Sequence, residues 1–519
     1  MNIMAFCGNK SILEKDNSLN TDDLDADVLI AGAGPSGAIC AYYLAQSGKK
    51  VILIDSQSFP RDKICGDFVS PVALKELMEI GIADLHEFKA THRVTAATVY
   101  IDGQKLITDH IPKVKDFVNY GRVIPRVLLD SWIVNAAKQQ GVEVITDCKL
   151  LNYFVNEQHV TVDCNHSDKN RRFLIKMLVG ADGSSSTVAR ILQGKKPNPN
   201  HKIVAVRAYC EHVNCISHHA ELFFTSKSFP GYYWFFPTSS TTANVGIGAV
   251  LGTFPKNETN LKTLLLEMME KDPFFKEKIG QETKITKIAG WPLSCYDPAA
   301  INVKDRVLLT GDAAGFINPF TGEGIQYALQ SGRLAAESII ECFEAENFSA
   351  ASLKRFDSKV CKEITHDLSF VNIFMQLTRN RNLNVLWVNV MKIILYQAKK
   401  DPKYATLSGG FFVGVVPMYR LLSISYVSKT ILTSISCFFR TKNILKQATI
   451  FISQQILLVF KQKITYLNWI KHLSMSMLLF IRLSIKIGFI KMGIFLKRLC
   501  RKNFTRRLTK LFWGSRLEP

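Results

Sequence analysis

The stretch DVLIAGAGPSGAICAYYLAQSGKKVILID, from Asp27 to Asp55, decides the fold. Its apolar start, Asp27 to Ala31, is strand-like, and a helix is predicted from about Ser36 to Gln46. Glycines in a GxGxxG pattern permit a tight turn, let the backbone approach a pyrophosphate, and let the helix pack close to the strand. These glycines are Gly32, Gly34 and Gly37.

A second apolar strand, Val51 to Ile54, follows the helix and ends at Asp55. An acid at this place accepts hydrogen bonds from ribose hydroxyls. The helix N-terminus offers free N–H groups and a partial positive charge to an anion. The order of strand, glycine turn, helix, strand and acid therefore predicts a dinucleotide-binding unit. The motif alone does not separate FAD from NAD.

A second glycine-rich segment, RVLLTGDAAGFINPFTGEGIQYALQSG, runs from Arg306 to Gly332. It predicts a short strand over Val307 to Leu309 and a helix from about Gly324. Asp312 suits a ribityl hydroxyl, and the amides around Glu323 suit a pyrophosphate or a flavin ring carbonyl. Taken alone, this segment fits a capped helix after a turn equally well. Together, the two segments indicate one FAD held from both ends.

Four motifs together resemble the FAD-dependent geranylgeranyl reductase family: GAGPSG, PRDKICGD (Pro60 to Asp67), GADGSSSTVAR (Gly180 to Arg190) and GDAAGFINPFTGEG. This family lies within the flavoprotein group that includes aromatic hydroxylases and flavin-dependent halogenases. The resemblance covers roughly Asp27 to Met418. It implies an α/β fold, in which a Rossmann-like FAD-binding domain carries an inserted mixed or antiparallel β-sheet substrate domain. A helical C-terminal region follows.

The resemblance also implies roles for single residues. Arg126 matches an arginine that contacts flavin phosphates, and Cys65 matches a cysteine that lies near the flavin in relatives. Asp55 stands where Glu is common, and its side chain is shorter. The predicted cofactor-binding set is Gly32, Gly34, Pro35, Ser36, Gly37, Asp55, Arg61, Lys63, Gly66, Arg126, Asp182, Gly183, Gly311, Asp312, Gly322, Gly324 and Ile325.

An aromatic block, ELFFTSKSFPGYYWFFP, runs from Glu221 to Pro237. In a strand, alternate side chains face opposite sides, so Tyr232, Trp234 and Phe236 share one face. This predicts a cavity wall on one face and core on the other; the alternative is that every ring fills the core. The YxWxFP spacing resembles a block of the reductase family. It also resembles the GWxWxIP block of halogenases, from which Tyr232 and Phe236 depart.

An aromatic-walled pocket beside a flavin suits an apolar substrate such as a polyprenyl chain. The expected reaction is hydride delivery from reduced flavin to an isolated C=C bond, with a proton from a nearby acid. The predicted catalytic residues are Cys65, Tyr232 and Trp234; the alternative for Cys65 is an inert buried thiol. Reduced nicotinamide (NADPH) or ferredoxin is the expected electron donor.

Three functions stay open at this point. The leading one is reduction of a polyprenyl group on a lipid, diphosphate, quinone or pigment precursor. The second is a flavin-dependent monooxygenase or halogenase that acts on an apolar substrate. The third is a membrane-tethered flavoprotein that acts as a redox or binding partner.

The net charge of +21 lies mostly in the C-terminal tail. Residues 421–519 contain 18 Lys and Arg and one acid, which gives +17. The longest uncharged run there, 447–460, is shorter than the about 20 residues that a transmembrane helix needs. Basic, apolar helices of this kind lie in the interface of an anionic membrane. The prediction is a peripheral or monotopic membrane anchor, and the alternatives are a helical cap on the body and a hairpin through the bilayer.

The expected organisation has four parts. A flexible tail at 1–26 precedes a discontinuous FAD-binding domain within 27–343, which is made of 27–89, 121–190 and 289–343 and carries a substrate domain mainly at 202–288. A helical cap at 344–420 and the basic tail at 421–519 follow. The first residues lack the features of a signal or transit peptide. The twelve cysteines show no regular spacing, which predicts neither a metal site nor a disulfide framework. Such thiols suit a reducing compartment such as the cytoplasm. No nucleic-acid-binding module is recognisable.

Overall fold

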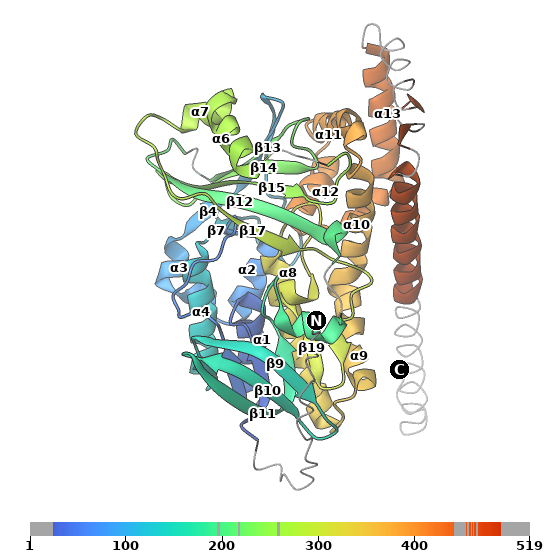
Figure 1. Cartoon of the computed structure of the whole chain (residues 1–519). Coiled ribbons are helices and arrows are strands. Elements are labelled where there is room, and N and C mark those ends of the chain that lie inside the picture. The colour runs from blue at the N-terminus through green and yellow to red at the C-terminus, as the bar shows by residue number, and fades with distance from the viewer. Residues whose placement is uncertain are drawn as a thin grey trace, which may run out of the picture.

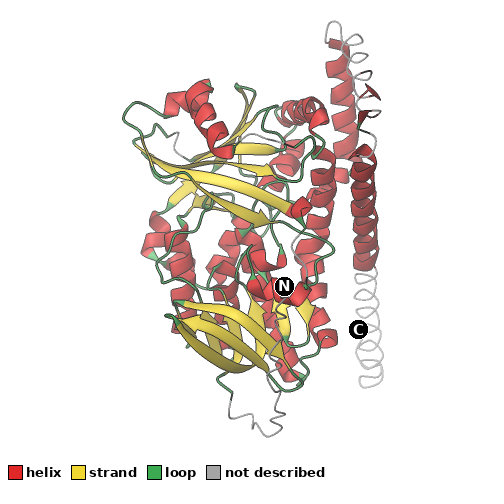
Figure 2. Cartoon of the chain, in the orientation of Figure 1, coloured by secondary structure: helices red, strands yellow, loops and turns green. Residues whose placement is uncertain are grey.

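The computed structural model describes residues 24–194, 198–215, 218–256, 260–440 and 465–488, and six single positions between 453 and 462. Two large sheets lie at opposite ends of the view, with helices between them (Figure 2). A third, three-stranded sheet of β3 (Phe68–Val69), β7 (Gly121–Val123) and β4 (His92–Val94) is also present. The fold is therefore α/β, as the sequence predicts.

The first sheet has the strand order β18-β19-β11-β1-β2-β8. Five strands run parallel to one another: β1 (Ala26–Ala31), β2 (Val51–Ile54), β8 (Glu143–Ile145), β11 (Lys169–Gly180) and β19 (Val307–Leu309). β18 (Val303–Lys304) is antiparallel, as are β10 (Val160–His166) and β9 (Cys148–Val155), which extend from β11. The predicted strands 51–54 and 307–309 are confirmed.

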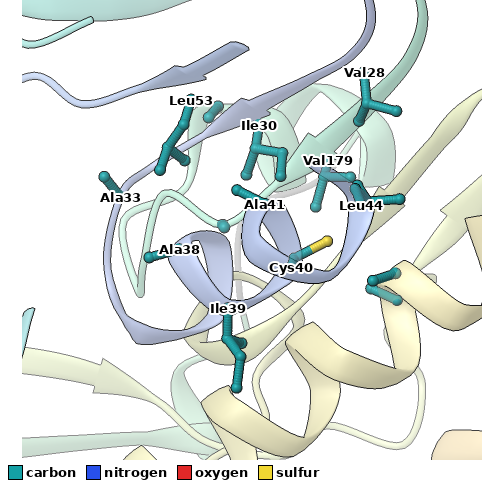
Figure 3. Packing of buried hydrophobic residues seen from close by; sticks show 14 of the residues in the cluster. Val28, Ile30, Ala33, Ala38, Ile39, Cys40, Ala41, Leu44, Leu53 and Val179 are labelled. Atoms are coloured by element: carbon teal, nitrogen blue, oxygen red, sulfur yellow. The ribbon is translucent and has the colours of Figure 1, made fainter. Parts of the chain in front are cut away.

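Helix α1 (Pro35–Gln46) packs against this sheet through its small and apolar side chains (Figure 3). It begins one residue before the predicted start and ends where predicted. α8 (Ile325–Glu344) crosses α1 so closely that a Cβ on Gly332 would lie 2.3 Å from the Ser36 carbonyl oxygen. α4 (Arg126–Gln139) also packs on α1, and α5 (Thr187–Gln193) follows β11. The two glycine-rich segments thus meet in one packed unit.

The second sheet has the order β16-β12-β15-β14-β13-β5-β6, and β17 pairs with β12. Its strands are β5 (Ala96–Ile101), β6 (Gln104–His110), β12 (Lys202–Glu211), β13 (His219–Phe224), β14 (Gly231–Pro237), β15 (Thr242–Val250), β16 (Lys284–Ile285) and β17 (Ala289–Ser294). Only β5 and β13 among these pair in parallel, so the sheet is mixed, as predicted. The expected domain boundary at 289 differs from the structure, because β17 pairs with β12 along its whole length.

Four short helices lie between or against the strands. α2 (Pro71–Glu79) and α3 (His86–Ala90) connect β3 to β4, and Ser70 caps α2. α6 (Leu261–Lys271) and α7 (Pro273–Lys278) cover one face of the second sheet.

The C-terminal region is helical: α9 (Ala350–Val360), α10 (His366–Thr378), α11 (Asn384–Ala398), α12 (Pro402–Phe412) and α13 (Ile424–Arg440), with residues 465–488 also helical. The helix of 465–488 runs beside α10 (Figure 1), where the Trp469 indole N–H donates to the Gln376 carbonyl oxygen at 2.6 Å. The expectations for residues 1–23 and 489–519, and for most of 441–460, lie outside the described residues. No described helix combines the length and the apolar character needed to cross a bilayer.

Candidate functional site

Two glycines of the first segment have no room for a side chain. Gly32 has a φ of +103°, and a Cβ there would lie 2.3 Å from the Ala181 carbonyl oxygen. A Cβ on Gly37 would lie 1.9 Å from the carbonyl oxygen of Gly32. These residues let the end of β1, the start of α1 and the end of β11 come together, so their role is to close the turn.

Gly34 is different, because the space beside it is open. A Cβ there would meet only the Arg61 Nη2 atom, at 3.9 Å. Gly34 precedes Pro35 and Ser36 at the N-terminus of α1, whose first N–H groups lack helical partners. An open cradle, a helix N-terminus and an arginine at one place suit a pyrophosphate.

Four buried or half-buried charges support this cradle. Arg61 pairs with Asp55 at 3.3 Å and with Asp130 at 3.1 Å. Arg126 binds Asp130 through two hydrogen bonds of 2.7 and 2.8 Å. The Ala33 amide donates to the same Asp55 oxygen at 2.9 Å. Asp130 was not recognised from the sequence, although its spacing of four residues after Arg126 in a helix is a usable signal.

The second glycine segment faces the same place from the other side. Lys63 Nζ lies 3.3 Å from the Asp312 carboxylate, although the residues are 249 positions apart. The Ser184 hydroxyl donates to the same oxygen at 3.3 Å. Gly311, which precedes Asp312, has a φ of +59°, and a Cβ on Gly322 would have nothing within 4 Å. Gly324 and Ile325 then lead into α8.

Asp182 has a structural task in this arrangement. Its carboxylate accepts from the Thr187 amide at 2.6 Å and from the Val188 amide at 3.2 Å, and it also binds the Ser186 hydroxyl. It therefore caps the start of α5. Gly183, beside it, has a φ of +77°.

A cavity of about 220 Å³ adjoins these loops. Tyr232, Trp234 and Phe236 of β14 line it, while Tyr233 and Phe235 pack into the core under α6 and α7. The two faces of the strand therefore differ as predicted, although Trp234 and Phe236 are themselves buried in a second apolar cluster. Lys63, Cys65, Gly66, Arg126 and Asp312 also line the cavity, so the structure brings both halves of the predicted site together.

The polar ends of two wall rings are already hydrogen-bonded. The Tyr232 hydroxyl donates to the Thr321 carbonyl oxygen at 2.5 Å. The Trp234 indole N–H donates to Asn244 Oδ1 at 2.9 Å. These bonds fix the rings as walls of the cavity. A direct chemical role for either ring stays a prediction.

Cys65 lies half-buried in the loop after β2, and the Asp67 amide donates to its sulfur at 3.3 Å. Burial raises the pKa of the Cys65 thiol, and the positive charge of Arg126 only partly opposes this effect. Thiol, not thiolate, is the form that this environment favours. A role for Cys65 as a nucleophile is therefore unfavourable, and its catalytic role stays a prediction.

Asp67 forms a buried polar network that sequence reasoning did not find. It accepts from the Tyr209 hydroxyl at 2.5 Å and from the Asn244 amide at 2.8 Å. Asn244 also donates to the Cys65 carbonyl oxygen at 2.8 Å. Burial raises the pKa of Asp67 to about 6, against these hydrogen bonds. The network ties the CGD loop to β12 and β15, and so fixes where Cys65 lies.

The fold and these loops define an FAD-dependent oxidoreductase. Residues 25–357 match the family described as "FAD binding domain". The chain belongs to this family and, within it, to the geranylgeranyl reductase-like flavoproteins.

The individual relatives carry names of different kinds. "Conditioned medium factor receptor 1" of Dictyostelium discoideum is 31% identical over 67% of this chain and 70% of its own length. "Digeranylgeranylglycerophospholipid reductase" of Methanococcus vannielii is 26% identical over 72% and 95%. The crystal structure of a geranylgeranyl bacteriochlorophyll reductase-like protein from Thermoplasma acidophilum, at 22% identity, superposes with a TM-score of 0.64 over 82% of this chain and 99% of that one. This last likeness shows the shared fold.

Proposed function

We propose that this flavoprotein reduces carbon–carbon double bonds of a polyprenyl group carried by a lipid, a diphosphate, a quinone or a pigment precursor. The observation that carries the proposal is the aromatic-walled cavity, which opens directly beside the loops that fit FAD. An apolar chain gains about 0.8 kcal/mol for each buried CH₂ group, so it binds there without charged partners. The archaeal relative named as a lipid reductase supports the same substrate class.

The residues present fit FAD on both sides of the cavity. Gly34, Pro35, Ser36 and Arg61 would hold the pyrophosphate, and Asp312 with the Gly322–Ile325 turn would hold the flavin end. Once bound and reduced, FAD would supply a hydride, that is, two electrons. The protein's own part is to orient the chain against the aromatic wall and to exclude water from it. Reduced nicotinamide (NADPH) or ferredoxin is the donor class that we propose for re-reduction.

A second candidate function follows from the name of one relative, a receptor. In this alternative the chain is a membrane-tethered flavoprotein that binds a partner and has no substrate of its own. The two functions differ in one observable property. Only the reductase shows turnover of its flavin that depends on a prenyl substrate.

Deleting the gene is expected to leave prenyl chains unsaturated. Lipid mass spectrometry of cells without the protein should show prenyl species that are lighter by two hydrogens for each double bond that is normally reduced. Re-expression of the wild-type chain restores the masses, and the Trp234→Ala variant, which opens the cavity wall, restores them poorly. Unchanged prenyl lipids, together with oxygen consumption in proportion to an oxygenated product, would instead identify a monooxygenase.

We also propose that the C-terminal helices bind a membrane surface. The helix of 465–488 uses one face on α10, where Asn372 donates to the Ser476 hydroxyl at 3.1 Å. Its outer face exposes apolar side chains, with Met475 58% and Leu478 67% exposed, and the cations Lys471 and Arg482 are also exposed. α13 also exposes apolar side chains, among them Ile431 and Leu432. Apolar side chains with interspersed cations suit the interface of an anionic bilayer.

Removing two tail charges is expected to weaken binding to anionic vesicles. Each Lys or Arg near such a surface contributes about 1 kcal/mol, so Lys471→Gln with Arg482→Gln should reduce the partition constant about 30-fold. Vesicle flotation measures the loss. The matched control is Lys149→Gln with Lys169→Gln, two exposed cations on β9 and β11, which should leave binding unchanged. Equal effects of both pairs would mean that net charge, not the tail, governs binding.

A further inference from the structure

Glu323 lines the cavity next to the start of α8. Cys65 and Tyr232 line the same cavity. Its Oε1 atom is buried and has no hydrogen-bond partner among the described residues. The Tyr232 hydroxyl is bound to the carbonyl of Thr321, two residues before Glu323, so the ring and the carboxyl belong to one corner of the cavity. The sequence singled out only the backbone amide of Glu323.

No charged group is among those that shift the pKa of this carboxyl. The titratable groups that interact with it are Tyr232 from β14 and Tyr327 from α8. The Ser70 hydroxyl before α2 also lies close to it, although this hydroxyl donates to Gln326 Oε1 at 2.9 Å. Burial raises the pKa of Glu323 to about 7, and the nearby Ser70 hydroxyl opposes this effect only in part. The carboxyl therefore carries its proton below about pH 7 and loses it as the pH rises through that value.

The two other carboxylates that line the cavity, Asp312 and Asp67, interact with cations. Asp312 is paired with Lys63 at 3.3 Å. Burial also raises the pKa of Asp67, to about 6, and its Oδ1 atom likewise has no partner among the described residues. Asp67 nevertheless accepts two hydrogen bonds through its other oxygen, and the positive charges of Arg207 and Arg126 oppose the effect of burial. Glu323 thus differs from both, because no cation is among the groups that influence its charge.

We propose that Glu323 is the acid that gives the proton when a double bond of the substrate is saturated, an inference that rests on the proposed reductase function. The alkene accepts a hydride from the reduced flavin on one carbon and the carboxyl proton on the other. In this step the π bond, an N–H bond of the reduced flavin and the carboxyl O–H bond would break, and two C–H bonds would form. The flavin is left oxidised and Glu323 is left as a carboxylate, which solvent reprotonates.

The other candidates for this proton are poorer. A general acid works best when its pKa lies near the working pH. Burial raises the pKa of the Cys65 thiol and of the Tyr232 hydroxyl above their ordinary values, which already lie well above neutrality. Tyr232 also directs its proton at the Thr321 carbonyl. Glu323 is the acid of this corner whose proton is available at neutral pH.

The test compares Glu323→Gln, which keeps the shape but has no acidic proton, with Glu323→Asp and Cys65→Ser in the FAD-loaded protein. The first readout is the absorption spectrum of the bound flavin as the pH passes through neutrality. The wild type and Cys65→Ser should show a transition near pH 7, which Glu323→Gln lacks while it retains its flavin. Glu323→Asp, which keeps a carboxyl, should retain a transition.

The second readout is the anaerobic single-turnover rate with a prenyl substrate. For the wild type the rate should fall as the pH rises through about 7, because the acid form is lost. Glu323→Gln should be slower by a factor of about 10² to 10⁴ and should lack this fall. A Glu323→Gln rate and pH profile like those of the wild type would overturn the inference and leave the proposed function intact. Failure of every prenyl substrate to oxidise the wild-type flavin would overturn the function, and the donor role with it.

Discussion

Gly37→Ala is expected to abolish FAD binding, although alanine is the better helix former. Alanine in a helix is favoured over glycine by about 1 kcal/mol. At this position, however, the new Cβ would lie 1.9 Å from the carbonyl oxygen of Gly32, which is backbone and cannot move aside alone. Overpacking lowers the free energy of unfolding by about 1–3 kcal/mol where side chains can adjust. Because backbone is involved here, we expect this free energy to fall by about 2 kcal/mol or more. The flavin content of the purified protein measures the loss of FAD binding, and urea unfolding measures the loss of stability.

Gly409→Ala is the matched control for this substitution. Gly409 also lies in a helix, α12, but a Cβ there would have nothing within 4 Å. The helix preference then acts alone, so stability should rise by up to about 1 kcal/mol with the flavin content unchanged. A stable, flavin-loaded Gly37→Ala protein would show that the approach of α1 to β1 does not determine cofactor binding.

Asp130→Asn is expected to be the most damaging change of a single charge. Asp130 is fully buried and binds both Arg126, with two hydrogen bonds, and Arg61. Removing one partner of a buried ion pair costs about 3–5 kcal/mol, because the remaining charge stays desolvated and unpaired. Asparagine keeps one acceptor oxygen, so the lower end, about 3 kcal/mol, is expected for the flavin-free protein. Urea unfolding of that protein is the measurement.

Asp163→Asn supplies the comparison. Asp163 pairs with Arg172 at 2.7 Å, but the Arg172 side chain is 67% exposed. Solvent-exposed pairs contribute about 0–1 kcal/mol, so this substitution should change stability by less than about 1 kcal/mol. Similar losses for both variants would mean that the Asp130 network contributes no more than a surface pair.

The parts of the site that follow from local geometry were predictable. The spacing of Gly32 and Gly37 demands a close approach of helix and strand, and the structure shows why no other residue fits. The alternation of Tyr232 and Trp234 with Tyr233 and Phe235 fixes two faces of a strand, and these faces became cavity wall and core. Both patterns depend only on the repeat of the element that carries them.

The parts that depend on distant pairing were not predictable. Asp67 meets Tyr209 and Asn244, which are 142 and 177 positions away in the chain. Nothing in the local sequence specifies that register. The same holds for β17, whose pairing with β12 moves a domain boundary. The docking of 465–488 on α10 uses contacts such as Trp469 with the Gln376 backbone, which hydropathy does not report.

The central claim is that an apolar prenyl chain, not oxygen, takes the electrons of the flavin. The most direct measurement is anaerobic reoxidation of the reduced flavin by a panel of prenyl diphosphates, prenylated lipids and prenyl quinones, followed by flavin absorbance and product mass. We predict reoxidation by at least one class, with one double bond saturated for each flavin oxidised. No anaerobic reoxidation by any of them, with rapid reoxidation by oxygen and an oxygenated product, would contradict the account.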